Sequence, residues 1–324
     1  MKAVLCKVFG PPEKLVLEEV PSPSVSAGQA LVDVKACGVN FPDTLIIEGK
    51  YQFRPEPPFS PGGEVAGVVA EVGAGVTHVK PGDRVVALMP WGGYAERIVT
   101  DATRLIPIPD GVTFVQAAAT PTTYGTTYYA LEDRAQMKKG ETLLVLGAAG
   151  GVGIAAVQLG KLMGARVIAA ASSPEKLETC KREGADLLLD YSKEDLKERV
   201  KALTNGAGAD VVYDPVGGKY SEAALRATAW NGRLLVIGFA AGEIPKIPLN
   251  LTLLKGASIM GVFWGQFTMR EPARALAQFT QLFEWIRDGK ITPHVHATPP
   301  LAEAPAAMRT LLDRKVQGKI VLVT

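Results

Sequence analysis

The sequence has very few cysteines and histidines, three of each among 324 residues. Cys6, Cys37 and Cys180 are an odd number, lie far apart and form no C-x-x-C pair. This pattern favours neither a disulfide framework nor a structural zinc site.

Long apolar runs are missing as well. No uninterrupted apolar stretch approaches the roughly 18 residues of a membrane span, and the opening residues, MKAVLCKVFG, alternate like a strand instead of forming the apolar core of a signal peptide. We therefore expect a cytoplasmic protein without a membrane partner.

Neither sign of charge is in excess. The chain has 35 basic and 33 acidic residues, a formal net charge of +2, and it shows no repeat, low-complexity tract or long charge block. Nucleic-acid binding normally requires a basic surface, so we expect no nucleic-acid partner. The length and the 47% of hydrophobic residues indicate a globular protein with two cored domains, with one large α/β domain as the alternative.

Two kinds of pattern divide the chain. Up to about residue 120, short strands are separated by turn signals such as PGG at 61–63 and PGD at 81–83, which indicates a mostly β domain. From about residue 140, apolar strands at 143–146, 166–171, 187–191, 210–214 and 233–238 alternate with helical stretches. This alternation predicts an α/β fold with a doubly wound parallel sheet, a Rossmann domain.

The last part of the chain is too short to fold alone. It holds a helical stretch at 272–287, a second helix around 304–313 and a closing strand at 319–323. We expect it to complete the first domain, which gives residues 1–121 with 264–324 for the mostly β domain and 122–263 for the Rossmann domain. A tail packed on the sheet is the alternative.

A glycine cluster follows the first strand of the predicted parallel sheet. In GAAGGVG at 147–153, Gly150 and Gly153 match the second and third glycines of G-x-G-x-x-G, while Ala148 replaces the first. The unpaired amides at the start of the next helix, including those of Gly151 and Val152, suit a pyrophosphate. An ordinary strand-to-helix turn is the alternative.

The end of the second parallel strand predicts which dinucleotide binds. No carboxylate stands there to bond the ribose of NAD, whereas Ser172, Ser173 and Lys176 could hold a 2′-phosphate. We therefore expect NADPH, with a helix cap formed by Ser173 and Pro174 as the alternative or additional role. Gly238, Phe239 and Ala240 follow the fifth strand and are expected near the nicotinamide.

Six motifs together resemble one known family. They are CGVNFPD at 37–43, PGGEVAG at 61–67, PGDRV at 81–85, GGYAE at 92–96, AAGGVG at 148–153 and DPVGG at 214–218. In order and spacing, over essentially the whole chain, they resemble the zinc-free, zeta-crystallin-like quinone oxidoreductases of the medium-chain dehydrogenase/reductase superfamily. The resemblance implies a GroES-like catalytic domain, a Rossmann domain, NADPH as cofactor and a homodimer.

The resemblance also implies roles for single residues. It places Asn40 and Asp43 near the nicotinamide, makes Thr126 a cofactor contact and assigns Lys176, Tyr191 and Arg314 to the adenosine 2′-phosphate.

No zinc site is expected. Zinc dehydrogenases of the same superfamily have Cys where this chain has Asn40 and His where it has Gly63, and an amide with a glycine cannot replace those ligands. Glu64 alone is a poor zinc site, and we expect it to bond within the core. His294 and His296 share one strand face without a third donor.

Without a metal, the acceptor must itself be electrophilic, which favours quinones and activated enones. Asn40 could donate an N–H to the oxygen that gains charge. Tyr51 is either a proton donor or an aromatic wall, and Asp43 either orients a donor or caps a helix that begins near Thr44. Phe263 and Trp264 are expected at the cofactor. Together with Trp91 and Phe267 they could instead line a pocket for a flat acceptor, and the alternative for all four is a place in the core.

Two other functions compete with this one. An enoyl thioester reductase would share the fold and the cofactor but would need a basic groove for its phosphates, and the sequence indicates none. A non-enzymatic NADPH- or RNA-binding crystallin-like protein is the alternative from another class, and the balanced charge and the lack of an RNA-binding motif argue against its RNA-binding version.

Overall fold

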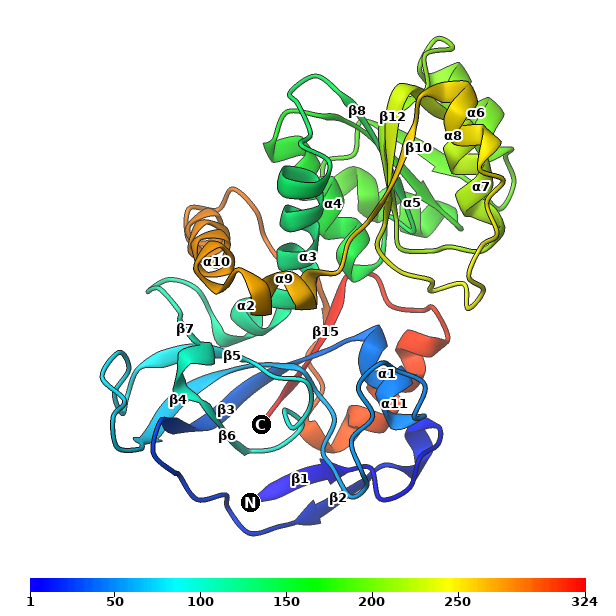
Figure 1. Cartoon of the computed structure of the whole chain (residues 1–324). Helices are drawn as coiled ribbons and strands as arrows, with labels where there is room; N and C mark the ends of the chain where they lie inside the picture. Colours follow the sequence, from blue (N-terminus) through cyan, green and yellow to red (C-terminus); the bar gives the residue numbers. More distant parts are fainter. The chain divides into compact units, whose positions relative to one another are not determined.

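A computed structural model describes residues 1–324, and two main sheets organise the chain. Tertiary contacts group Met1–Thr122 with Phe279–Thr324 as the first unit and Thr123–Gln278 as the second. In Figure 1 the first unit is blue to cyan and red, and the second is mainly green to yellow. None of the helices combines the length and apolarity that a bilayer span requires.

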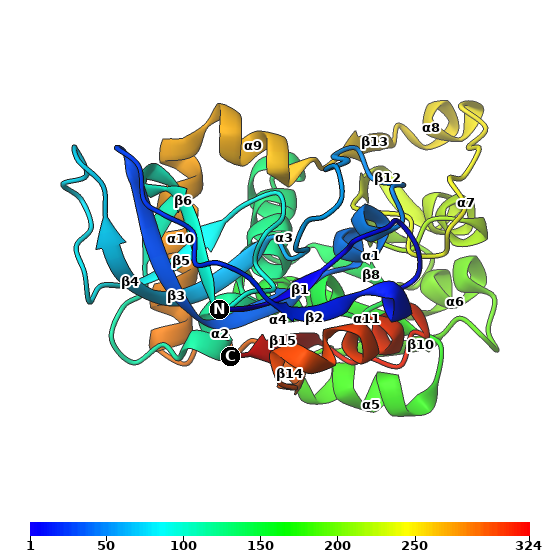
Figure 2. The same ribbon diagram turned by 90° about the horizontal axis from the view of Figure 1, so that it is seen from below.

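The first unit is built on a mostly antiparallel sheet with the strand order β14-β15-β3-β4-β5-β7, and β6 pairs with β3. A separate pair, β1 and β2, runs side by side in Figure 2. The strands are β1 (Lys2–Leu5), β2 (Val16–Glu19), β3 (Gln29–Val39), β4 (Glu64–Val72), β5 (Arg84–Leu88), β6 (Arg97–Asp101), β7 (Leu105–Pro107), β14 (Val295–Ala297) and β15 (Lys319–Val323). The helices are α1 (Phe41–Ile47), α2 (Phe114–Ala119) and α11 (Ala304–Leu312).

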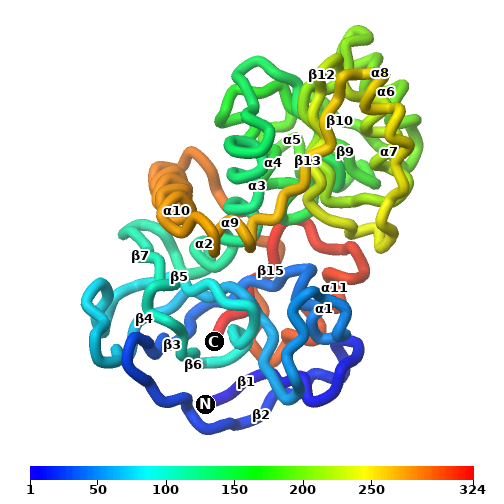
Figure 3. Tube along the Cα trace, in the orientation of Figure 1, coloured from blue at the N-terminus to red at the C-terminus, as the bar shows by residue number.

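Strand β3 lies between β15 and β4 in the sheet of the first unit. The last strand, β15, pairs antiparallel with β3, so that Ile320 lies opposite Val39, and Figure 3 shows the red end of the chain beside this blue strand. On the other side of β3, Cys37 lies opposite Val65 of β4. The chain leaves β3 at Asn40, and a proline in the first turn of α1 fits the start of that helix.

The second unit holds a six-stranded parallel sheet in the order β10-β9-β8-β11-β12-β13, which confirms the predicted doubly wound fold. Its strands are β8 (Thr142–Leu146), β9 (Arg166–Ala171), β10 (Leu187–Asp190), β11 (Ala209–Asp214), β12 (Thr228–Val236) and β13 (Ser258–Gly261). Its helices are α3 (Thr126–Tyr128), α4 (Gly151–Leu162), α5 (Pro174–Arg182), α6 (Leu196–Leu203), α7 (Lys219–Arg226), α8 (Asn250–Lys255) and α9 (Trp264–Arg270), followed by α10 (Pro272–Arg287).

Helices cover both faces of the parallel sheet. Helices α6, α7 and α8 share one apolar cluster with the strands and lie together in Figure 1. Helix α4 packs on the opposite face, where Gly160 lets it approach Leu143 and Val167 closely. The helices cover the two faces, so a ligand is expected to bind at the turns that follow the carboxyl ends of the strands.

Several predicted bounds were wrong in detail. The sequence pattern predicts a helix near residues 220–229, but helix α7 ends at Arg226, because Thr228 already pairs with Ala209 in the sheet. Strand β13 and helices α8 and α9 were not predicted. Helix α1 begins at Phe41 and not near Thr44.

Residues 264–278 group with the second unit, whereas the sequence division assigned them to the first domain. Three side-chain contacts tie this segment to the second unit. Phe267 stacks on Tyr129 with ring centroids 4.3 Å apart, and Asp133 accepts hydrogen bonds from Arg274 and Gln278.

Candidate functional site

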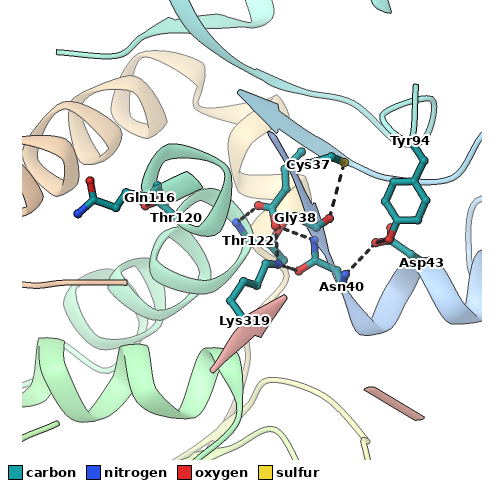
Figure 4. Close-up of polar contacts among 10 residues, drawn as sticks. Cys37, Gly38, Asn40, Asp43, Tyr94, Gln116, Thr120, Thr122 and Lys319 are labelled. Atoms are coloured by element: carbon teal, nitrogen blue, oxygen red, sulfur yellow. Dashed lines mark hydrogen bonds and ion pairs between the residues drawn. The ribbon is translucent and has the colours of Figure 1, made fainter. Parts of the chain in front are cut away.

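A buried polar cluster lies where β3, β4 and β15 of the first unit come together. The Asn40 amide Nδ2 donates to Glu64 Oε1 at 2.7 Å, and Lys319 Nζ donates both to the same carboxylate oxygen, at 2.5 Å, and to Asn40 Oδ1. Figure 4 shows Asn40 and Lys319 turned toward this common point. The strand registers explain the meeting, since Lys319 precedes Ile320, the partner of Val39, and Glu64 precedes Val65, the partner of Cys37.

Glu64 and Lys319 form an ion pair inside the protein. Their side chains are 0% and 4% exposed, so the pair is withdrawn from water. The second oxygen of Glu64 accepts the backbone N–H of Thr122 at 2.7 Å. A β-carbon at position 38 would lie against Glu64 Oε1 and 2.6 Å from the carbonyl oxygen of Ala118, so Gly38 leaves the space that the carboxylate occupies.

Asp43 lies beside this cluster in the first turn of α1. Its Oδ2 accepts the backbone N–H of Asn40 at 2.8 Å and the hydroxyl of Tyr94 at 3.1 Å. Burial raises the pKa of Asp43 to about 7, although both hydrogen bonds and the nearby Lys319 favour its carboxylate form. The carboxyl therefore links the start of α1 to Tyr94, and it does so from within the helix.

Tyr51 follows α1 and is partly buried. Its ring lies 6.0 Å from that of Phe53 and packs on the core of the first unit. Burial and then the charge of Asp43 raise the pKa of the Tyr51 phenol. The hydroxyl makes no hydrogen bond within the protein, so the geometry is compatible with a donor and with a wall.

The residues of this site do not fit a zinc ion. Nowhere in the chain do three or more His, Cys, Asp or Glu side chains gather in a metal-binding arrangement. Glu64 is already bound by Lys319 and Asn40. A β-carbon at Gly63, where the zinc dehydrogenases have histidine, would lie 3.0 Å from the carbonyl oxygen of Met89, which is a tight contact.

The glycine loop of the second unit fits a pyrophosphate. Helix α4 begins at Gly151 with Gly150 as its N-cap, and no side chain caps it. The amides of Gly151, Val152 and Gly153 therefore keep their N–H groups at the positive end of the helix. A β-carbon at Gly153 would collide with the carbonyl of Gly147 and lie 2.8 Å from Ala148, so only glycine allows this tight loop.

The turn after β9 and the start of α5 contain Ser172, Ser173 and Lys176, three of the residues predicted to hold a 2′-phosphate. Ser173 caps α5, since its hydroxyl accepts the backbone N–H of Lys176 at 3.4 Å, which confirms the predicted cap. The backbone N–H of Tyr191 donates to the carbonyl of Ala171 at 3.1 Å, so Tyr191 and Ser172 flank the same strand end. Arg314 belongs to the first unit and follows α11 in a left-handed conformation, with φ of 58°.

Two further residues predicted at the cofactor lie against glycines of the second unit. Phe239, in the loop with Gly238 and Ala240, packs against Gly217, where a β-carbon would lie 2.9 Å from its ring. The indole of Trp264 lies against Gly125, where an added β-carbon would be 2.8 Å from the ring.

Gly125 directly precedes Thr126, the first residue of α3. Two π-helical turns, Pro121–Gly125 and Tyr129–Arg134, lie on either side of this short helix. Phe263 is about half exposed, at 48%, whereas Phe267 is buried as a core aromatic.

Sequence reasoning did not find Lys319. The signal was present, because a lysine begins the closing strand KIVLV, in which the following residues are almost all buried. A charged residue in such a strand requires a buried partner. The sequence expectation that Glu64 bonds within the core was correct, but its partner lies 255 positions away.

The chain was also compared with known proteins. Two family models match it: an alcohol dehydrogenase GroES-like domain over residues 26–110, and a zinc-binding dehydrogenase domain over residues 151–282. A quinone oxidoreductase-like protein 2 homolog of Nematostella vectensis is 40% identical over 327 residues, covering 100% of this chain and 89% of the relative.

Two similar solved structures contain NADPH. The Escherichia coli quinone oxidoreductase complexed with NADPH has a TM-score of 0.93 and 31% identity, with both chains covered completely. A mycobacterial protein complexed with NADPH has the same TM-score and 35% identity, again with complete coverage of both chains.

Proposed function

This chain belongs to the quinone oxidoreductase family of the medium-chain dehydrogenase/reductase superfamily, and on that premise we propose that it transfers a hydride from NADPH to a quinone or an activated enone without a metal. The membership makes the chain an NADPH-dependent oxidoreductase. The acceptor class, the metal independence and the roles of single residues are the proposal.

The bound NADPH would supply the hydride, and residues of the second unit would hold it. The amides of Gly151, Val152 and Gly153 would bind the pyrophosphate. Thr126, the loop of Gly238, Phe239 and Ala240, and the aromatic pair Phe263 and Trp264 would contact the nicotinamide half. Ser172, Ser173, Lys176 and Tyr191 would bind the 2′-phosphate, and the role of Arg314, which belongs to the first unit, stays a prediction of the family resemblance.

One observation carries the choice of acceptor. The place where zinc dehydrogenases have metal ligands holds an amide, Asn40, whose Nδ2 uses one N–H on Glu64 and keeps the other. A neutral N–H donor can stabilise charge on an oxygen but does not polarise a carbonyl as strongly as a metal ion. The acceptor must therefore be electrophilic by itself, as quinones and activated enones are.

The test is NADPH oxidation with a panel of quinones, simple enones and short enoyl-CoA thioesters, with NADH as the control cofactor. We expect turnover with quinones or enones and little with thioesters. Turnover of thioesters alone would favour the enoyl thioester reductase and direct attention to Tyr51 as proton donor. Salt-sensitive RNA binding without any turnover would favour the crystallin-like alternative.

Lys176 should determine the cofactor preference. We predict that Lys176→Ala raises the Kd for NADPH by about tenfold to a hundredfold, the value of one charged hydrogen bond, and leaves the Kd for NADH within about twofold. Titration calorimetry measures both constants. Lys181→Ala, an exposed lysine on the same helix, is the matched control and should change neither. An equal loss for both cofactors would contradict the assignment.

We also propose a homodimer formed through the second unit. Strand β13 is one of the two edges of the parallel sheet, and Ile259 on it is 38% exposed, while Leu253 of the preceding helix is 80% exposed. An exposed apolar edge strand readily pairs with another strand. A cytoplasmic location and the absence of a nucleic-acid partner stay predictions of the sequence.

Ile259→Lys should weaken this dimer. We expect at least a tenfold rise in the dimer Kd, because the change puts a charge into the paired edge, and light scattering over a concentration series measures it. Ile244→Lys replaces an isoleucine that is more exposed, at 70%, but outside the sheet, and should leave the dimer intact. A monomeric native protein would contradict the proposal.

A further inference from the structure

The partners of the Asn40 side chain fix its orientation. A carboxylate only accepts hydrogen bonds and an ammonium only donates them. Since Nδ2 of Asn40 donates to Glu64 and Oδ1 accepts from Lys319, exchanging the amide oxygen and nitrogen would place like groups against each other at both contacts. Only one of the two orientations of the Asn40 amide therefore satisfies both partners.

The same contacts determine which N–H remains available. Lys319 Nζ and Glu64 Oε1 are 2.5 Å apart, so the three side chains close a ring on one edge of the amide. The N–H of Asn40 that is not in this ring makes no hydrogen bond within the protein. Asn40 is buried except for 8% of its surface, and its neighbours therefore limit where that N–H can point.

We propose that Lys319 and Glu64 are positioning residues, which hold the Asn40 amide so that its remaining N–H faces the oxygen of the acceptor. This inference rests on the proposed function, in which Asn40 contacts that oxygen. Lys319 and Glu64 act only through Asn40.

Stability alone does not explain the pair. The desolvation of two buried charges offsets most of their attraction, and packed apolar residues of similar size often serve a fold equally well. Here the pair is placed with its donor on one end of the amide and its acceptor on the other. That arrangement is what an amide donor requires in order to stay in one orientation.

The decisive experiment is a kinetic cycle between Asn40 and the ion pair. Glu64→Gln with Lys319→Met gives a neutral background in which a glutamine accepts either amide orientation. We expect kcat to fall by about tenfold or more in this background, with the Kd for NADPH unchanged. Asn40→Ala should lower kcat by about a hundredfold in the native protein, as for a lost oxyanion donor, but by about tenfold or less in the neutral background, which has already lost the rest of that effect.

A second readout does not depend on activity. The chain has only four asparagines, at positions 40, 205, 231 and 250, so selective 15N labelling gives four side-chain amide signals, and Asn40→Ala assigns one of them. In the cofactor-free protein, the hydrogen-bonded proton of Asn40 should exchange with water at least tenfold faster in the neutral background. Lys315→Met, an exposed lysine on the approach to the same strand, is the matched control and should leave exchange and kcat unchanged.

The outcomes separate the two proposals. If the native protein reduces no acceptor, the proposed function fails, and amide exchange still tests the positioning. If the native protein is active but Asn40→Ala costs the same in both backgrounds, or the exchange does not change, the positioning role is overturned. Should the neutral variant fail to fold, Glu64→Leu with Lys319→Met provides a second neutral background for the same two measurements.

Discussion

Glu64→Leu should lower the free energy of unfolding by about 3–5 kcal/mol, because it leaves the ammonium of Lys319 buried without its carboxylate. Leucine is close to glutamate in size, so the lost charge and not a cavity dominates the effect. The change also removes the acceptor for the backbone N–H of Thr122 and the one for Asn40 Nδ2. Urea denaturation at neutral pH measures the difference.

Removal of both charges should restore most of the loss. Glu64→Leu with Lys319→Met leaves no unpaired buried charge, and we expect it to unfold within about 2 kcal/mol of the native protein. Glu222→Leu breaks an exposed pair with Arg226 and is the matched control, for which less than about 1 kcal/mol is expected. A loss of that small size for Glu64→Leu would mean that water reaches Lys319.

The parallel sheet could be predicted from the sequence because its signals are local. Each strand is a short apolar run, each helix follows within a few residues, and the capping of α5 by Ser173 depends on a three-residue contact. The order of the strands then follows from the general rules of doubly wound sheets. Edge strand β13 was missed because it has only four residues, of which Ser258 and Gly261 at its two ends are not strand-favouring.

The polar cluster could not be predicted in the same way. Asn40 and Asp43 were singled out by family resemblance, but the neighbours that define their chemistry are set by strand register between distant segments. Lys319 meets Asn40 only because β15 returns to pair with β3. No local rule gives that register, so the sequence suggested a donor at Asn40 without the pair that orients it.

Between about pH 4 and pH 7, the free energy of unfolding of the native protein should fall by about 4 kcal/mol more than that of Asp43→Asn. Burial raises the pKa of Asp43 from 3.8 to about 7, so the folded chain keeps this proton over a range in which the unfolded chain has released it. The folded state then binds more protons, and the free energy of unfolding falls as the pH rises. Two pKa values about three pH units apart correspond to about 4 kcal/mol.

Urea denaturation of both proteins at pH values from 4 to 8 measures this difference, which should become constant above about pH 7. The asparagine that Asp43→Asn introduces cannot ionise, yet its amide oxygen can still accept the N–H of Asn40 and the hydroxyl of Tyr94, so the variant keeps the local hydrogen bonds. Asp101→Asn is a control of opposite sign, because its hydrogen bonds with Thr103 lower the pKa of that carboxyl and its contribution is lost as the pH falls. A native-minus-variant difference for Asp43→Asn that does not change with pH would show that Asp43 is ionised throughout, and that the cluster around Lys319 contains a second stable carboxylate.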